Sequence, residues 1–334
     1  MEAKAQFPKS LQDAIRYFCD PDVCVEFLAS VRWPDGVQCP ACEQKRATFL
    51  KSRRIWKCKE CSRQFSVKLG TIFEESPIPL DKWLTAVWLV VNCKNGVSSY
   101  ELAKDLNITQ KSGWFMLHRI REALKNRSFE KLGGNGGAVE SDESFIGANP
   151  QKMHKERRLK LQQARSMKRG TDVWPGKTAV IGMLDRQTRK IRTQVIPNVK
   201  RETLQNAILD NVAYGSTVYT DAAVAYDNLG KSFVHEVVNH AVEYVNGQVH
   251  TNGLENFWSL FKRNLRGTYV SVEPFHLERY LDEQVWRFNN RGGKKREDRV
   301  SDSDRFVMAC SQITGKRLTF AELTGKAGQQ QEAF

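Results

Sequence analysis

The composition of the 334-residue chain is typical of a globular protein, with 40% hydrophobic and 27% charged residues. It excludes long disorder, collagen and coiled coil as the main architecture, and the longest apolar run is too short to span a membrane. The length suggests about two domains. The N-terminus has no apolar signal core, so we expect a cytoplasmic protein. The formal net charge of +14 favours a polyanionic partner, nucleic acid before an anionic membrane surface.

Four of the eight cysteines form two C-x2-C pairs separated by fifteen residues. After a helical N-terminal segment (residues 1–30), this spacing predicts a zinc ribbon over residues 31–70. Each short loop supplies two thiolates to one tetrahedral structural Zn²⁺. Without a secretion signal the cysteines should stay reduced, and the other four are expected to be small core residues. The expected zinc ligands are Cys39, Cys42, Cys58 and Cys61.

The ribbon is strongly basic, with nine Lys and Arg and a single acid between residues 45 and 68. A solvated charged surface would explain this pattern. Trp56 and Phe65, however, lie among the charges, and this mixture favours a module that contacts nucleic-acid phosphates.

Residues 78–130 are expected to form helices that end in a helix-turn-helix-like pair. A serine at 98–99 can cap a short helix, Asn107 makes the turn, and Thr109 can cap a longer helix. The start of that longer helix is where helix-turn-helix proteins contact bases. A plain helical bundle is the alternative interpretation. The residues expected to contact DNA here are Gln110 and Lys111.

A glycine-rich linker, residues 131–137, precedes an expected α/β domain over residues 138–291, and residues 292–334 form a C-terminal extension. Three consecutive strands and then alternating helices and strands give the order of an RNase H-like domain. The expected strands are 138–148, 177–186, 190–197, 216–221 and 233–238, and the expected helices include 201–212, 251–266 and 275–290.

A basic insert, residues 150–175, separates the first two strands of this domain. Eight Lys and Arg and a single acid lie between residues 152 and 169, a pattern that favours contact with phosphates. The cations expected to bind DNA are Lys152, Lys155, Arg157 and Arg158.

Three acids fall where an α/β fold builds its site. Asp142 lies on the first strand, Asp221 ends the fourth, and Glu255 lies on the helix that follows the fifth. Three ordinary surface acids are the alternative. Carboxylates gathered in this way would repel one another, so hard divalent cations are the natural way to satisfy them.

Helical periodicity selects Glu255 as the third acid. It lies on one flank of the 251–266 helix, beside the buried apolar stripe, whereas Asn256 points nearly opposite that stripe. Asn252 lies one turn earlier and can orient Glu255. The same flank carries two cations suited to grip a nucleic-acid phosphate, Lys262 and Arg266.

Together these motifs resemble the insertion-sequence transposases that join an N-terminal zinc ribbon to a DDE domain, the bacterial group related to the eukaryotic Merlin elements. The resemblance covers about residues 20 to 291 and rests on C-P-A-C…C-K-E-C, V-E-S-D-E-S-F-I-G, V-Y-T-D and H-T-N-G-L-E-N-F-W-S-L-F-K-R. The family's third acid varies between Glu and Asn, which keeps Asn252 and Asn256 open as alternatives. The positions that match the family's acids and following lysine are Asp142, Asp221, Glu255 and Lys262.

The resemblance implies a DNA transposase of a bacterial insertion sequence, associated with the nucleoid. Two catalytic Mg²⁺ or Mn²⁺ ions held by the three acids would support cleavage at the element ends and attack of the freed 3′-OH on target DNA. The ribbon and the helical pair would bind the terminal inverted repeats of double-stranded DNA. Pairing of two ends implies at least a homodimer on DNA.

Two other classes remain open. One is an RNase H-like metal-dependent nuclease or resolvase that cuts but does not join strands. The other is a domesticated zinc-ribbon DNA-binding regulator without catalysis. The presence of all three acids and Lys262 argues against the regulator.

Overall fold

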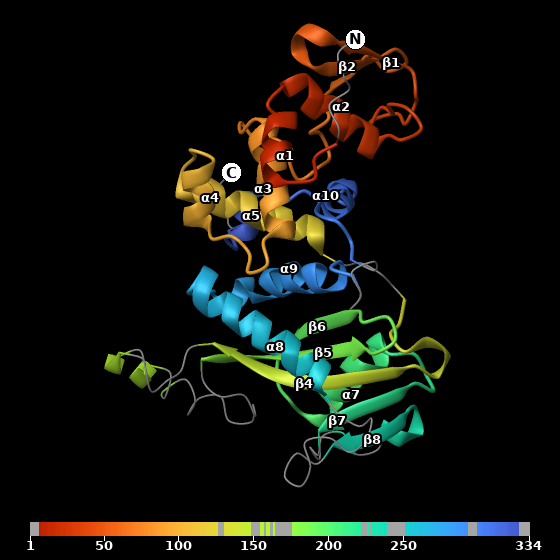
Figure 1. Cartoon of the computed structure of the whole chain (residues 1–334), viewed down its shortest axis with the longest axis vertical. Helices are drawn as coiled ribbons and strands as arrows, with labels where there is room; N and C mark the ends of the chain where they lie inside the picture. The colour runs from red at the N-terminus through yellow and green to blue at the C-terminus, as the bar shows by residue number, and fades with distance from the viewer. Residues whose placement is uncertain are drawn as a thin grey trace, which may run out of the picture. The chain divides into compact units, whose positions relative to one another are not determined.

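The protein is described from a computed structural model. The structure describes residues 7–125, 130–147, 154–156, 158–160, 163, 176–221, 226, 229–238, 251–292 and 299–326. The chain divides into two compact units (Figure 1). Unit 1 combines Met1–Lys125 with Asn290–Phe334, and unit 2 is Asn126–Asn289. Among the described helices, none has both the length and the apolar character needed to cross a membrane.

Unit 1 begins with α1 (Leu11–Tyr17) and α2 (Pro21–Arg32), which pack with the C-terminal helix α10 (Asp302–Ser311). A cluster of rings joins them, since Phe306 of α10 stacks on Phe27 of α2 with centroids 5.4 Å apart. The residues expected to form a C-terminal extension therefore complete the core of unit 1. A short helix, α11 (Phe320–Leu323), follows.

The ribbon is a three-stranded antiparallel sheet of β1 (Ala47–Leu50), β2 (Ile55–Cys58) and β3 (Gln64–Phe65). Trp56 and Phe65, which the sequence suggested as part of a nucleic-acid contact surface, instead face the interior. Trp56 and Phe65 are buried against each other and against Trp33, so they form the small core of the ribbon. Phe49 on β1 is 41% exposed and is the aromatic ring that this sheet offers to a partner.

Three further helices complete unit 1: α3 (Leu80–Asn92), α4 (Ser99–Asp105) and α5 (Gln110–Leu124). Ser98 caps α4 in a capping box with Glu101, and Thr109 caps α5. The turn between them contains Asn107, whose φ of 47° is left-handed. At Gly113 an added Cβ would lie 3.0 Å from the carbonyl oxygen of residue 99, so glycine lets the two helices approach closely.

Unit 2 is built on a five-stranded mixed sheet with the order β6-β5-β4-β7-β8. The β4–β5 and β5–β6 pairs are antiparallel, and the β4–β7 and β7–β8 pairs are parallel. Each strand lies where the sequence pattern predicted one. The strands are β4 (Ala138–Gly147), β5 (Lys177–Asp185), β6 (Ile191–Ile196), β7 (Thr217–Asp221) and β8 (Val234–Val238).

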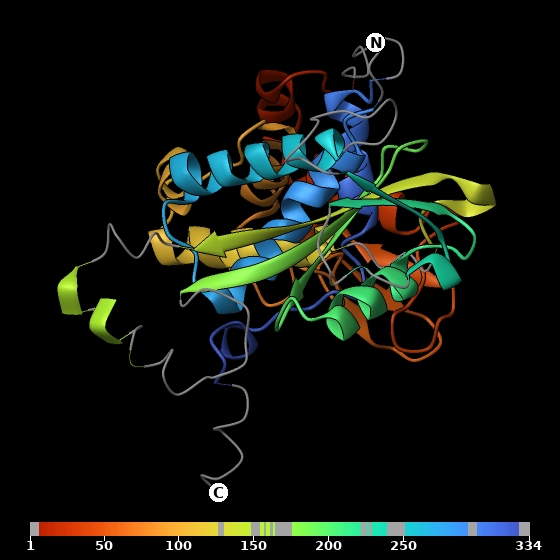
Figure 2. The same cartoon turned by 90° about the horizontal axis from the view of Figure 1, so that it is seen from below.

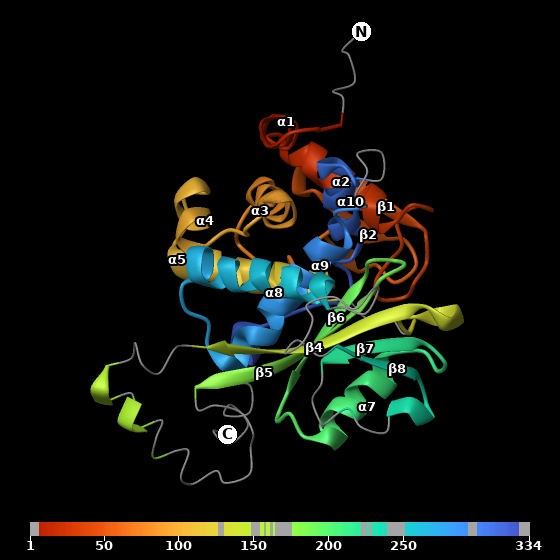
Figure 3. The ribbon, with the colours of Figure 1, turned by 60° about the horizontal axis from the view of Figure 1, so that its bottom comes forward.

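Helices cover both faces of this sheet (Figures 2 and 3). On one face, α7 (Arg201–Asn211) packs over a core that includes Val139 and Val218. On the other face, α8 (Asn252–Asn264) and α9 (Leu277–Asn289) pack over a core that includes Val180 and Leu184. The helix expected between β7 and β8 falls largely outside the described residues, which include a 3-10 turn there, Leu229–Lys231.

The glycine-rich segment 131–137 differs from the free linker that the sequence predicted. Leu132 is buried in the core under α7, and the carbonyl oxygen of Gly133 accepts a hydrogen bond from the Ser216 hydroxyl at 2.7 Å. Gly133 has a φ of 75°, and an added Cβ would lie 2.6 Å from that hydroxyl oxygen. Its glycine therefore serves close packing inside unit 2 rather than flexibility.

Candidate metal centres and nucleic-acid interface

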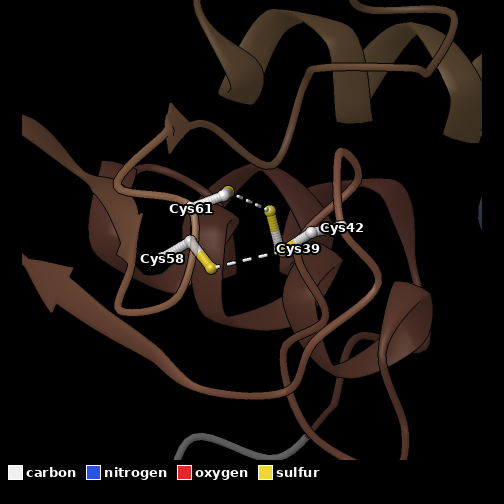
Figure 4. A group of neighbouring side chains, drawn as sticks. All are labelled: Cys39, Cys42, Cys58 and Cys61. Atoms are coloured by element: carbon white, nitrogen blue, oxygen red, sulfur yellow. Dashed lines mark hydrogen bonds between the residues drawn. The ribbon is translucent and has the colours of Figure 1, made fainter.

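The four predicted zinc ligands meet at one point of the ribbon (Figure 4). The Sγ atoms of Cys39 and Cys61 are 3.6 Å apart, as are those of Cys42 and Cys58, and all four lie within 4.8 Å of one another. A tetrahedral zinc with bonds near 2.3 Å would place thiolates roughly 3.8 Å apart. The expectation that these cysteines converge is confirmed, and their geometry suits one structural zinc with no open position.

Two similar loops produce this convergence. The backbone N–H of Cys39 donates to the carbonyl of Gln44, and that of Cys58 donates to the carbonyl of Arg63, both at 2.9 Å. In each loop the residue after the second cysteine has a left-handed backbone, with φ of 59° at position 43 and 58° at position 62. Desolvation raises the pKa of Cys39, but hydrogen bonds from backbone N–H groups and with neighbouring cysteines together lower it more, to about 7, which favours the thiolate form of this cysteine.

The three predicted acids lie on neighbouring elements of unit 2, but among the described residues only the four cysteines form a group close enough to hold a metal ion as they stand. The parallel register of β4 and β7 pairs Glu140 with Tyr219, and continuing it brings Asp221 level with Asp142. Both acids then project from the face that α8 covers, because side chains two residues apart share a face. Glu255 approaches from the first turn of α8, where it is exposed.

The acids influence one another electrostatically. Burial raises the pKa of Asp142 to about 6, and the carboxylates of Asp221 and Glu255 add to this effect. Lys262 also interacts with Asp142: burial lowers the pKa of the lysine, and the negative charge of Asp142 partly offsets that shift. The charged form of Asp142 is therefore less favoured than that of an ordinary aspartate.

One further acid lies beside this cluster. Glu143 follows Asp142 on β4 and projects from the opposite face of the strand. Burial, with help from Asp221 and Asp142, raises its pKa to about 8. The V-E-S-D-E motif contained this residue, but strand alternation alone gives no reason to expect that it would be buried.

Small residues let α8 come close enough to complete the site. Gly182 on β5 is the antiparallel partner of Asp142, and an added Cβ there would lie 2.7 Å from the Trp258 ring and 3.0 Å from the Leu254 side chain. The missing side chain lets the Trp258 indole lie against the sheet beside Asp142, where it weakly lowers the pKa of that carboxyl.

Beyond Glu255, the flank of α8 becomes basic. An open hollow of about 470 Å³ lies along its C-terminal half. The predicted phosphate contacts Lys262 and Arg266 both line it, together with Arg263, which the flank argument did not include. The helix then ends in a π-helical turn, Leu265–Tyr269. Three cations around one open hollow suit a phosphate backbone.

The remaining predicted residues are spread over both units. Asn252 begins α8, and Asn256 is exposed on it. Lys155 and Arg158 are exposed, whereas two other insert cations lie outside the described residues, namely Lys152 and Arg157.

The two residues expected to contact bases already have partners inside unit 1. Gln110 donates a hydrogen bond from Nε2 to the Ser99 hydroxyl at 2.9 Å. The Lys111 ammonium lies 4.8 Å from the centre of the Phe320 ring, in α11. Farther along α5, Arg119 is buried and donates to the Leu318 carbonyl at 3.0 Å. Lys111, at the start of α5, is nevertheless exposed, whereas Arg119 serves packing within unit 1.

Comparison with known proteins identifies the chain. The transposase zinc-ribbon domain matches residues 20–64, and the ISXO2-like transposase domain matches residues 133–289. The two matches define the class, that of transposases with an N-terminal zinc ribbon. The chain belongs to the family of ISXO2-like insertion-sequence transposases, which confirms the resemblance inferred from its motifs.

Individual relatives agree with this assignment. The chain is 40% identical over 102 residues to an uncharacterized transposase-like protein of Haemophilus influenzae, covering 30% of this chain and 82% of that one. It is 29% identical over 273 residues to an uncharacterized protein in transposable element ISH50 of Halobacterium salinarum, covering 80% and 90% of the two chains.

Among solved structures, the chain is similar to one in the simian T-cell lymphotropic virus intasome in complex with PP2A regulatory subunit B56 gamma. The sequence identity is 10% and the TM-score 0.30, over 65% of this chain and 72% of that one. A likeness this weak carries no argument about fold or function.

Proposed function

We propose that this transposase binds the terminal inverted repeats of its element and catalyses metal-dependent DNA strand cleavage and strand transfer on an RNase H-like unit. The observation that carries the proposal is that Asp221, Glu255 and Lys262 all lie within electrostatic reach of Asp142, beside the parallel β4–β7 pair. The strand order and the helices on both faces support the RNase H-like assignment.

The acids have the chemistry of a divalent-cation site. They offer hard oxygen ligands, and the pKa of Asp142, raised by burial and then by the nearby carboxylates, supports a bound cation that would stabilise its charged form. Asp142, Asp221 and Glu255 would hold two Mg²⁺ or Mn²⁺ ions. When bound, two such ions stabilise the attacking and leaving oxygens of an in-line displacement at phosphorus.

The chain's own cations would place the DNA. Lys262 lies within electrostatic reach of Asp142 and lines the basic hollow, so it would hold a phosphate next to the acids. Arg263 and Arg266 would neutralise neighbouring phosphates along the same strand. Both proposed steps, cleavage and joining, would then use one set of acids on one positioned backbone.

The zinc ribbon and the α4–α5 pair would recognise the element ends. The short α4, the four-residue connection and the longer α5 have the proportions of a helix-turn-helix, with Gln110 and Lys111 at the start of the second helix. Exposed cations on the ribbon and in the insert, including Lys155 and Arg158, would contact phosphates. Because two ends must be paired, the active form would contain at least two copies.

The decisive experiment changes Asp221 to Asn. This substitution keeps the shape of the side chain but removes a charge that the cations require, so end binding should survive. Cleavage and strand transfer should both fall by about 10³-fold or more, because residues that act as a unit fail together. The assay combines a labelled element end, a target plasmid and Mg²⁺ or Mn²⁺, with Asp142→Asn and Glu255→Gln tested in parallel.

Each alternative has its own signature in this assay. Cleavage in which even pre-cut ends are never joined would point to a nuclease. Binding by the wild type without catalysis in either metal would point to a regulator. Full activity of Asp221→Asn would rule out the proposed site, and full activity of Glu255→Gln would direct attention to Asn252 and Asn256.

A further inference from the structure

An ion pair between buried Glu140 and half-buried Arg186 lies on the face of the sheet that α8 covers. Glu140 precedes Asp142 by two residues on β4, so both side chains project from the same face of the sheet. Its side chain is only 2% exposed, and Oε1 accepts a hydrogen bond from Nε of Arg186 at 2.8 Å. Arg186 follows the last residue of β5.

The second oxygen of Glu140 reaches the first turn of α8. Oε2 accepts a hydrogen bond from the backbone N–H of Leu254 at 3.1 Å, and Leu254 immediately precedes Glu255. Thr251, at the N-cap position, makes no capping bond with its own side chain. A carboxylate 114 positions away in the chain therefore satisfies an N–H of the helix start, where a negative charge also suits the helix dipole.

The backbone of α8 is shaped for this contact. At Gly253 an added Cβ would lie 2.8 Å from Oε2 of Glu140 and 2.3 Å from the Leu184 side chain. A residue larger than glycine would push the helix start away from the sheet. Glycine at this position thus brings α8 within hydrogen-bonding distance of Glu140.

The guanidinium of Arg186 also contacts β7. Its central carbon lies 4.1 Å from the centre of the Tyr219 ring, a cation–π contact. Tyr219 precedes Asp221 by two residues and is buried. The ion pair is therefore linked to the element that carries each acid. Glu140 itself lies two residues before Asp142. Arg186 contacts Tyr219, two residues before Asp221, and Glu140 binds the backbone of Leu254, one residue before Glu255.

We infer that Glu140 and Arg186 are positioning residues, which hold α8 against β4 and β7 and so set the spacing of the three acids. The inference rests on the proposed function of those acids. Mutual repulsion drives the carboxylates apart, and a functional site needs its groups held to within about 0.5 Å. An ion pair in contact with all three elements supplies that restraint, and loss of either partner would remove the charge that balances the other.

The test compares three variants of the full-length, zinc-loaded protein. Glu140→Gln and Arg186→Gln each remove one partner of the ion pair. Asp185→Asn is the matched control, because Asp185 is also a buried carboxylate but bonds the backbone N–H groups of residues 133, 187 and 188 and not α8. Thermal unfolding sets a temperature at which every variant is folded.

Two measurements follow, one of them independent of activity. Tb³⁺ is titrated while its luminescence is excited through tryptophan, since Trp258 lies beside Asp142. The Mg²⁺ concentration needed for half-maximal cleavage of a labelled element end is then determined. Outer partners of metal ligands typically change affinity by about 10- to 100-fold, and we expect weakening of this size for both ion-pair variants. Asp185→Asn should stay close to the wild type.

Arg186→Gln separates positioning from simple charge. It removes a positive charge near the acids, so electrostatics alone would tighten metal binding, whereas lost positioning weakens it. Tighter binding in this variant, or a Glu140→Gln response equal to that of Asp185→Asn, would overturn the inference. A wild type whose Tb³⁺ titration equals that of Glu255→Gln would instead overturn the proposed function itself.

Discussion

The two candidate metal centres of this protein are assembled in opposite ways. The cysteine site lies within one ribbon, and its most distant ligands are 22 positions apart in sequence. The carboxylate site draws one acid from each of β4, β7 and α8, and one contact beneath it joins residues 114 positions apart. Unit 1 thus forms its site from local loops, and unit 2 forms its site from the packing of a helix on a sheet.

The difference also concerns what the metal does for the fold. The ribbon has a small core with a few buried rings, so a metal bound by the four thiolates would supply much of its stability. In unit 2 two large apolar cores hold the sheet and helices, and burial of the Asp142 carboxylate near two other acids disfavours its charged form. Metal should therefore be essential to the ribbon fold but should only relieve strain in the acid site.

The largest expected effect is loss of zinc. Cys58→Ser removes one of four ligands, and because structural zinc contributes roughly 10 kcal/mol to small domains, the ribbon should unfold. Zinc analysis and amide hydrogen exchange of the ribbon provide the measurement, with Cys19→Ser, at an exposed cysteine, as the control. Unit 2 should keep its exchange protection. Unchanged zinc content in Cys58→Ser would refute the assignment.

The second prediction is a gain in stability rather than a loss. The Asp142 carboxyl has a folded-state pKa of about 6 against an ordinary value of 3.8, so its contribution to stability is lost as pH rises from about 4 through 6. Asp142→Asn should therefore stabilise the metal-free protein at pH 7 by up to about 3 kcal/mol. The gain should vanish at pH 4.

Chemical denaturation of the metal-free protein at both pH values measures this gain. Saturating Mg²⁺ should reverse it, because the cation stabilises only the charged carboxylate. A variant that is less stable than the wild type at pH 7 would show that Asp142 supports the fold even without metal.

A smaller effect tests the close approach of α8. Gly182→Ala should destabilise unit 2 by about 2 kcal/mol, because the new methyl group would overlap the Trp258 ring. Gly230→Ala is the control, since nothing lies within 4 Å of its added Cβ. Thermal unfolding and zinc content are measured together. We expect the cysteine site to be unaffected by a change in unit 2, so loss of zinc from Gly182→Ala would contradict that expectation.

The smallest effects concern DNA. Replacing a phosphate-contacting cation should lower the slope of log affinity against log salt by about 0.9, equally for all sequences. Arg263→Gln in the hollow tests single contacts, and joint replacement of the insert cations Lys152, Lys155, Arg157 and Arg158 tests a larger set.

Changes at Gln110 or Lys111 should instead relax the preference for element ends. Salt titrations with specific and random DNA distinguish the two behaviours, and identical behaviour of both sets would contradict the division.

Much of the fold followed from local patterns. The pattern of apolar residues predicted the five strands described in unit 2, and Thr109 and the serine at 98 cap the helices expected after them. The cysteine spacing predicted a cluster that the structure contains. Each of these features depends on the period of a strand or helix, or on a loop of a few residues. A short stretch of consecutive residues is therefore enough to predict it.

Other features depended on contacts between distant segments. Alternation could not show that Trp56 and Phe65 fill the ribbon core while Phe49 is exposed, because a short hairpin has two faces and only its neighbours decide which is buried. The glycine-rich run at 131–137 had the composition of a linker, yet its glycines allow close packing. The residues after 290 showed no pattern that assigns them to unit 1.

The sequence by itself determined which residue types this protein uses: four thiols at metal spacing, and three acids on two strands and a helix. The tertiary structure decided how the acids meet. The register of β4 against β7 brings Asp142 level with Asp221, and two glycines and the Glu140 carboxylate bring α8 to the sheet. The physical reason is that strand register and helix approach are set by packing over the whole sheet, which no stretch of consecutive residues encodes.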